Sequence, residues 1–240
     1  MFLNANVLSE NQLGKIMARN TILMKLLSSE YLEFFLDGNL YMNTPKYFAT
    51  LEEEDLVRFD MDEGIHTSMQ TKEVSIRNEQ GEWVPIGGLI NPVIYRTQDA
   101  AAYNMYCMYG IQELIEEPLD DRNLAFGDTF VAITNSEEFL RRVKEAADKE
   151  ERTYEQSLIE YVDRETFDGF MGPFRKFSSF AYQQEFRMVL LGGDGFPTTL
   201  SIGDIRDICI VGPSVEFNQR LFRSLPEGNL SHMVYLSRKS

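Results

Sequence analysis

Three polar residues at alternate positions, Gln183, Glu185 and Arg187, form the best candidate for a chemical site in this sequence. They fall within residues 176–193, a segment that we predict to be one β-strand, in which successive side chains point to opposite faces. The three therefore share one face. The opposite face carries Tyr182, Gln184, Phe186, Met188 and Leu190. A rigid strand that holds a carboxylate between an amide and a guanidinium can build a binding or catalytic site. An ordinary solvated face, with Glu185 paired to Arg187, has the same pattern.

A second polar cluster consists of Arg58, Asp60 and Glu63, in the stretch RFDMDEG. In an extended segment Arg58 and Asp60 share a face, so an ion pair that closes a loop is the simplest interpretation. A role in the site would require this loop to fold over the polar face of the predicted strand.

Two further candidates, Tyr41 and Asn43, project together from a short predicted strand at residues 39–43. Asn43 either contacts a ligand or caps the turn that Thr44 and Pro45 are expected to begin. The sequence leaves both interpretations open.

Aromatic residues cluster in residues 100–115, where helix and strand are both possible. Tyr103, Tyr106 and Tyr109 can stack on a planar ligand ring, or they belong to the core. His66 follows the second polar cluster and is either a base or a structural or exposed histidine. Residues 192–195 are glycine-rich but lack the Lys-Ser/Thr of a phosphate-binding loop, so we predict a hairpin turn there.

Composition limits the classes of function. The 240 residues carry a formal charge of −15, which disfavours a broad nucleic-acid-binding patch and fits either solubility or a partner with a basic surface. The two cysteines, Cys107 and Cys209, are far apart, and only two histidines occur, so we expect neither a disulfide framework nor a metal site. No stretch has the length and apolarity of a membrane span, and the N-terminus lacks the pattern of a secretory signal. We expect a cytoplasmic protein.

The patterning predicts a single α+β domain over residues 1–240, with a central, mostly antiparallel sheet and flanking helices. Helices are expected at residues 9–18, 28–38, 136–149 and 214–224. Besides the strands at residues 39–43 and 176–193, strands are expected at residues 73–77, 83–86, 92–96, 130–134, 199–202, 205–211 and 233–236. Residues 158–162 fit a strand or a helical turn.

The order of four segments resembles a large bacterial and phage family catalogued only as a domain of unknown function. The segments are FFLDGNLYMNTPKYF (34–48), NMYCMYG (104–110), YQQEFRMVL (182–190) and IGDIRDICIVGP (202–213). This chain departs from that family after the first strand, where TPKYFATLEEED replaces the usual Phe-Asn-Asp-Pro.

The layout also resembles distant relatives of the ADP-ribosyltransferases, which carry a late Gln-x-Glu or Glu-x-Glu pair. Gln183-x-Glu185 matches that pair. The resemblance implies a domain of a phage–bacterium conflict system that uses NAD as substrate, with Glu185 as catalytic carboxylate and Gln183 beside it. A carboxylate suits this chemistry because cleavage of the nicotinamide–ribose bond develops positive charge on the ribose. The residues expected to contact NAD are Tyr41, Asn43, Arg58, Tyr106 and Arg187.

The alternative is a non-enzymatic inhibitor or binding protein. Its acidic surface, including residues 52–55, would dock on a basic surface of a host or defence protein.

Overall fold

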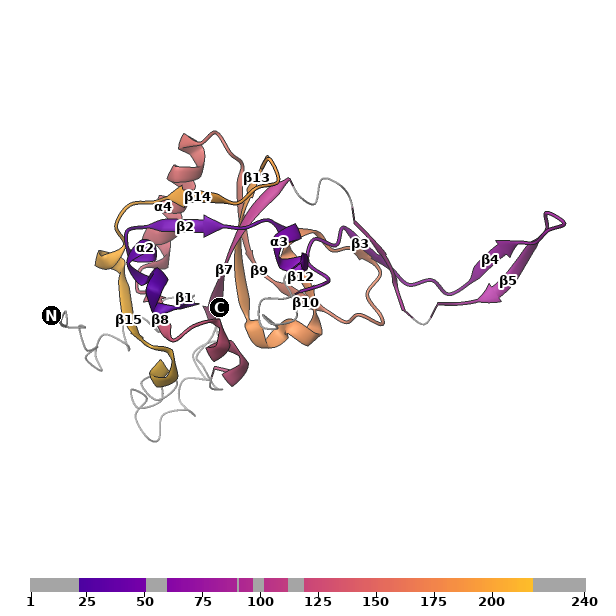
Figure 1. Ribbon diagram of the computed structural model, residues 1–240, viewed down its shortest axis with the longest axis horizontal. Helices are drawn as coiled ribbons and strands as arrows, with labels where there is room; N and C mark the ends of the chain where they lie inside the picture. The colour runs from indigo at the N-terminus through magenta and orange to yellow at the C-terminus, as the bar shows by residue number, and fades with distance from the viewer. Residues whose placement is uncertain (1–21, 51–59, 90, 97–101, 112–118, 218–240) are drawn as a thin grey trace, which may run out of the picture.

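A six-stranded antiparallel sheet forms the centre of the computed structural model, which describes residues 22–50, 60–89, 91–96, 102–111 and 119–217 (Figure 1). Every neighbouring pair in this sheet is antiparallel. The strands in spatial order are β15 (Cys209–Pro213), β8 (Thr129–Ile133), β1 (Ile22–Leu27), β7 (Tyr103–Ile111), β13 (Glu185–Leu191) and β9 (Tyr154–Leu158). With its flanking helices, this sheet confirms the predicted α+β class.

One face of the sheet packs on α4 (Ser136–Lys149), the 3-10 helix η1 (Ser29–Tyr31) with α2 (Leu32–Leu36), and the paired strands β2 (Asn39–Met42) and β14 (Thr198–Ser201). As predicted, α4 spans residues 136–149; its N-cap is Asn135, whose side chain accepts from the Glu138 amide. Its apolar stripe, which includes Phe139 and Val143, is buried in the largest core cluster.

The opposite face is covered by shorter elements. These are the 3-10 helices η4 (Asp121–Phe126), η5 (Gly172–Phe174), η6 (Ser178–Gln183) and η8 (Ser214–Glu216), and the parallel pair β10 (Glu160–Val162) and β12 (Arg175–Phe177). A further sheet of β11 (Gly169–Phe170), β3 (Thr67–Met69) and β6 (Val93–Tyr95) shares a core cluster with β10 and β12. The pair β10–β12 has the one parallel register among the strands of the described ranges.

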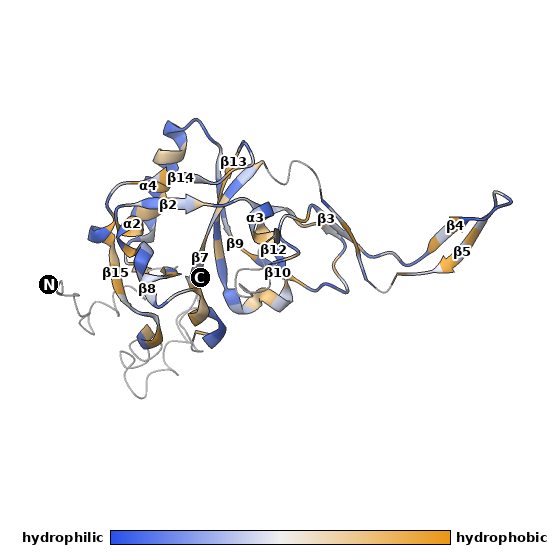
Figure 2. Cartoon of the chain, viewed as in Figure 1, coloured by the Kyte–Doolittle hydropathy of each residue, from blue (hydrophilic) through white to orange (hydrophobic). Residues whose placement is uncertain are grey.

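A β-hairpin arm extends from β3 and β6 well beyond the rest of the molecule (Figure 1). It consists of β4 (Val74–Arg77) and β5 (Trp83–Gly87), two of the predicted strands, joined by a turn in which Gly81 has φ +84°. Both strands carry hydrophobic residues in spite of this position (Figure 2). All five residues of β5 are exposed.

The prediction of one strand over residues 176–193 is wrong. The chain forms β12, then η6, and only then β13, because Gln184 takes a left-handed conformation with φ 39° that ends the helix before the strand starts. The alternation holds from Glu185 onward, but Gln183 and Tyr182 belong to the helix.

Other boundaries also differ. The expected turn at residues 44–45 is the start of α3 (Pro45–Thr50). The expected strand at residues 205–211 begins as η7 (Arg206–Ile208) and continues as β15. Residues 158–162 divide between the end of β9 and β10. The helix at residues 9–18 and the strand at residues 233–236 lie outside the described residues, as does most of the helix at 214–224.

Among the described residues, no helix has both the length and the apolarity needed to cross a membrane.

Candidate functional site

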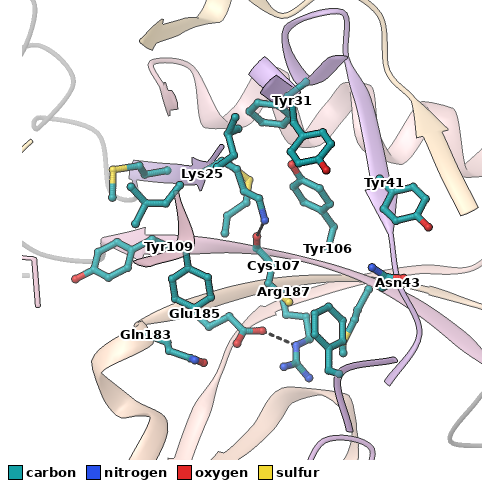
Figure 3. Close-up of a pocket in the computed structure, with 18 of the residues that line it drawn as sticks. Lys25, Tyr31, Tyr41, Asn43, Tyr106, Cys107, Tyr109, Gln183, Glu185 and Arg187 are labelled. Carbon is teal, nitrogen blue, oxygen red and sulfur yellow. Dashed lines mark hydrogen bonds and ion pairs between the residues drawn. The ribbon is translucent and has the colours of Figure 1, made fainter. Parts of the chain in front are cut away.

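A cavity of about 680 Å³ lies where β1 and β7 separate (Figure 3). The two strands pair only from Ile22↔Ile111 to Met24↔Tyr109. Beyond that point β1 continues along β8, and β7 continues along β13. The cavity is lined by residues of both diverging strands and reaches both faces of the sheet through the gap.

Lys25 bridges the gap between the two strands. Its ammonium group donates a hydrogen bond of 2.7 Å to the carbonyl of Cys107 and lies 4.4 Å from the centre of the Tyr106 ring. Tyr106 in turn stacks on Phe35 of α2, with ring centres 6.0 Å apart. The ammonium group of Lys25 thus lies between the diverging strands, against a carbonyl and an aromatic face.

Exposed aromatic side chains line the cavity on the α2 face of the sheet. They come from η1, α2 and β2, and are Tyr31, Phe34 and Tyr41, with exposed fractions of 56%, 43% and 52%. Tyr47 of α3 also lines the cavity and packs edge-on against Phe48, with ring centres 5.2 Å apart. Exposed aromatic rings beside a cavity suit a planar ligand group.

On the other face of the sheet, Arg187 forms the centre of a buried charged wall. Its guanidinium donates to both carboxylate oxygens of Glu63, at 2.8 and 2.9 Å, and its Nε donates to Glu185 at 2.7 Å. A further bond of 2.8 Å goes to the carbonyl of Pro173. The side chain is only 1% exposed, so these bonds replace its contact with water.

Lys176 of β12 is the second cation of this wall. Its ammonium group lies 3.0 Å from Asp60, 3.4 Å from Glu185 and 3.8 Å from Glu63. It also donates to the side-chain oxygen of Gln183 at 2.9 Å. The segment with Asp60 and Glu63 therefore folds over the strand face that carries Glu185 and Arg187. This position is the condition stated above for a role of the segment in the site.

The charged wall, which we define as Asp60, Glu63, Lys176, Glu185 and Arg187, has three carboxylates and two cations. Its formal charge is therefore one negative. Burial alone raises the pKa of Glu185, but the charges of Arg187 and Lys176 outweigh it and lower that pKa to about 2. Glu185 is consequently ionised at neutral pH.

Two neighbouring groups respond to the same surroundings. Burial alone lowers the pKa of Lys176, and the carboxylates around it, Glu185 first, raise that pKa above its ordinary value. Burial, followed by the charge of Glu185, raises the pKa of Cys107 to about 12. The lysine is charged at neutral pH and the thiol is neutral, so Cys107 is a poor nucleophile there.

Six of the seven predicted site residues line this same cavity. They are Tyr41, Asn43, Tyr106, Gln183, Glu185 and Arg187. Arg58 lies outside the described residues. The six divide between the two faces of the central sheet. Tyr106, which pairs with Met188, points to the α2 face. Glu185, which pairs with Tyr109, points to the other face, where the rest of the charged wall lies. A ligand must extend through the gap to contact both.

Asn43 does not start the helix that follows it. Tyr47 donates its amide to the carbonyl of Thr44, at 3.1 Å, and to the Thr44 hydroxyl, at 3.4 Å, so Thr44 takes the role expected of Asn43. The side-chain oxygen of Asn43 is buried and has no hydrogen-bond partner among the described residues. A buried polar atom without a partner is unfavourable, and this one belongs to a residue that lines the cavity.

The sequence reasoning missed Lys25 and Lys176. Lys25 had a local signal, because it interrupts the apolar stretch ILMKLL, and a single lysine inside a buried strand usually has a specific partner. Lys176 follows Arg175 in FRKF and had no comparable signal. Among the described residues, no group of three His, Cys, Asp or Glu side chains is arranged to hold a metal ion.

Comparison of the chain with protein-family models, with curated proteins and with solved structures finds no match.

Proposed function

We propose that this chain binds a nucleotide-sized ligand in the cavity between β1 and β7, and that the ligand is NAD. A volume of about 680 Å³ falls in the range of small-molecule sites, roughly 300 to 1,000 Å³. Dinucleotides combine flat rings with polar ribose and phosphate groups. Such a ligand matches a cavity with aromatic side chains at one face and charged side chains at the other.

The observation that carries the proposal is the position of Glu185. It is an ionised carboxylate, only 6% exposed, and it forms part of the cavity wall. Arg187 and Lys176 fix its position and keep it deprotonated. Gln183 stands next to it, although from η6 and not from the strand.

The chemistry would be the transfer of ADP-ribose from NAD. The bond between ribose C1′ and the nicotinamide nitrogen breaks, and its electron pair leaves with nicotinamide. The acceptor supplies the lone pair for the new bond and releases a proton. Positive charge develops on the ribose, and the net negative charge of the charged wall stabilises it. An ionised glutamate suits this electrostatic role, whereas a proton donor would need a raised pKa.

The test is incubation of the folded protein with NAD that carries a label on the adenylate part. We expect release of nicotinamide, and transfer of the label to a component of a cell lysate. Glu185→Gln keeps the shape of the side chain and removes its charge, so it should lower the rate about 10² to 10³-fold. Glu155→Gln on β9, an exposed residue two strands from β7, is the matched control and should leave the rate unchanged.

Binding is measured separately from turnover. NAD should raise the melting temperature of the wild type, and it should still do so in Glu185→Gln if that variant remains folded. Absence of both nicotinamide release and a melting shift, in protein with a cooperative unfolding transition, would overturn the proposal. A shift without release would support binding and reject the transferase chemistry.

The net charge of −15 favours a second candidate function, a binding protein that docks on a basic protein surface. The two candidates predict different behaviour in the phage–bacterium setting suggested by the sequence resemblance. A biological effect that needs catalysis should disappear in Glu185→Gln. An effect that needs only docking should survive that substitution and weaken with rising salt.

A further inference from the structure

The hairpin arm has an open strand edge and apolar residues on both of its faces. Ile76 pairs with Val84 on one face, and Arg77 pairs with Trp83 on the other. Trp83 is 70% exposed. An isolated two-stranded hairpin is marginally stable in water, and exposed hydrophobic strands pair readily with other strands. The arm therefore has the features of a surface that is covered by a partner.

The two outer edges of the arm differ. β5 contains Pro85, which has no amide hydrogen. β5 also has a bulge: Val74 pairs with Gly87 and Ser75 pairs with Pro85, so Ile86 is an extra residue without a partner position on β4. Proline and a bulge are features that block edge pairing. β4 has neither feature, so its outer edge is the one open to another strand.

We propose that the arm pairs with the arm of a second copy of this chain, β4 against β4 in antiparallel register centred on Ser75. The sequence Glu73-Val74-Ser75-Ile76-Arg77 is complementary to itself in that register. Glu73 lies opposite Arg77 of the second copy, and Val74 lies opposite Ile76. Opposite charges and aliphatic residues are the cross-strand pairs that stabilise antiparallel sheets. The two-fold axis repeats each pair, as in an isologous dimer.

Pairing of the arms joins the two hairpins into one four-stranded sheet. Because Val74, Ile76 and Val84 share a face, the two copies together form a continuous aliphatic surface on it. On the other face, Trp83 lies beside Arg77, whose charge is balanced by Glu73 of the second copy. Three or more strands with a shared apolar face are more stable than an isolated hairpin.

The charge distribution supports a second copy as the partner. Residues 72–89 carry two basic and three acidic residues, so nearly all of the charge of −15 lies outside the arm. β4 leads away from the rest of the molecule, and antiparallel pairing therefore puts the two acidic bodies at opposite ends of the joined arms (Figure 1). The arms can meet without bringing the two bodies close together. This inference does not depend on the proposed function.

The experiment is sedimentation equilibrium of the full chain from roughly 1 to 100 μM, because dimerisation depends on concentration. We expect a dimer within this range. Glu73→Arg and Arg77→Glu should each weaken it about tenfold or more, since each puts two like-charge pairs across the axis. The double variant restores opposite charges and should recover the wild-type affinity.

Lys72→Glu is the matched control for Arg77→Glu. It makes the same change of charge, but in the proposed register it faces Asn78 of the second copy, so the dimer should persist. Circular dichroism and thermal melting of each variant verify that the body is folded. A chain that is monomeric throughout the range would overturn the proposal. So would a dimer that both single variants leave intact, or one that the double variant fails to restore.

Discussion

Replacement of Arg187 by methionine should destabilise the fold strongly. Methionine fits the volume of the arginine stem but supplies no charge and no donor. Glu63 would lose two hydrogen bonds, of 2.8 and 2.9 Å, and Glu185 would lose one of 2.7 Å. Among the described residues, Lys176 would then be the one cation left near these two carboxylates, 3.8 Å from Glu63 and 3.4 Å from Glu185. Two buried carboxylates would share one cation that already pairs with Asp60.

The expected loss follows from the burial of these groups. Removal of one partner from a buried ion pair typically costs about 3 to 5 kcal/mol, because the remaining charge is left uncompensated. A domain of this kind has a free energy of unfolding of about 5 to 15 kcal/mol, so the variant would lose about a fifth of it or more. With a urea m-value of about 3 kcal/mol/M, the unfolding midpoint should fall by roughly 1 M or more.

Urea unfolding followed by circular dichroism measures this loss. The matched control is Arg175→Met on β12, where the arginine pairs with Glu160 near the surface, and there we expect a loss of at most about 1 kcal/mol. Adding Glu63→Gln to Arg187→Met should cost less than the sum of the two single losses, since the glutamine needs no counter-charge. The reasoning is refuted if Arg187→Met destabilises the protein no more than Arg175→Met.

Two further predictions concern stability. The pKa of Glu185 is lowered from 4.5 to about 2, so its charge contributes stability above pH 4.5 and that contribution is lost as the pH falls toward 2. Thermal melts should show the deficit of Glu185→Gln shrinking over this interval, and a constant deficit would contradict the assignment. At Gly38, with φ +79°, an added Cβ would lie 1.8 Å from the carbonyl oxygen of Gly203, whereas at Gly192, with φ +75°, it would meet nothing within 4 Å. Gly192→Ala should therefore cost about 1 kcal/mol and Gly38→Ala several times more, and equal melting temperatures would refute the close contact.

The elements predicted well are those with local signals. The helix predicted at residues 136–149 has the bounds of α4, and the helix predicted at residues 28–38 contains η1 and α2. Both strands of the arm were predicted as separate short strands, at residues 73–77 and 83–86. The strand predicted at residues 176–193 failed because its apolar and polar alternation also fits a 3-10 helix followed by a strand. The left-handed Gln184 that separates them has no sequence signature comparable to that of glycine.

The candidate site was predictable only in part. The alternation of Glu185 and Arg187 gave their shared face, and that prediction holds. The contact between Glu63 and Arg187 joins residues 124 positions apart, which no local pattern can indicate. The cavity itself depends on the divergence of β1 from β7 after Met24, and that divergence is a property of strand pairing across the whole sheet.

The charged wall admits a structural and a functional explanation, and they can be separated. Buried ion pairs are weak contributors to stability, since apolar residues of similar volume are often as good or better. Five buried charged side chains, four of which line the cavity, therefore call for a reason beyond stability. If the wall only ties the segment of Asp60 and Glu63 to β13, any activity should decline in step with stability across Arg187→Met and Glu185→Gln. If Glu185 acts on a ligand, Glu185→Gln should lower turnover about 10² to 10³-fold at temperatures where the variant is fully folded. The ratio of lost activity to lost stability in these two variants decides between the explanations.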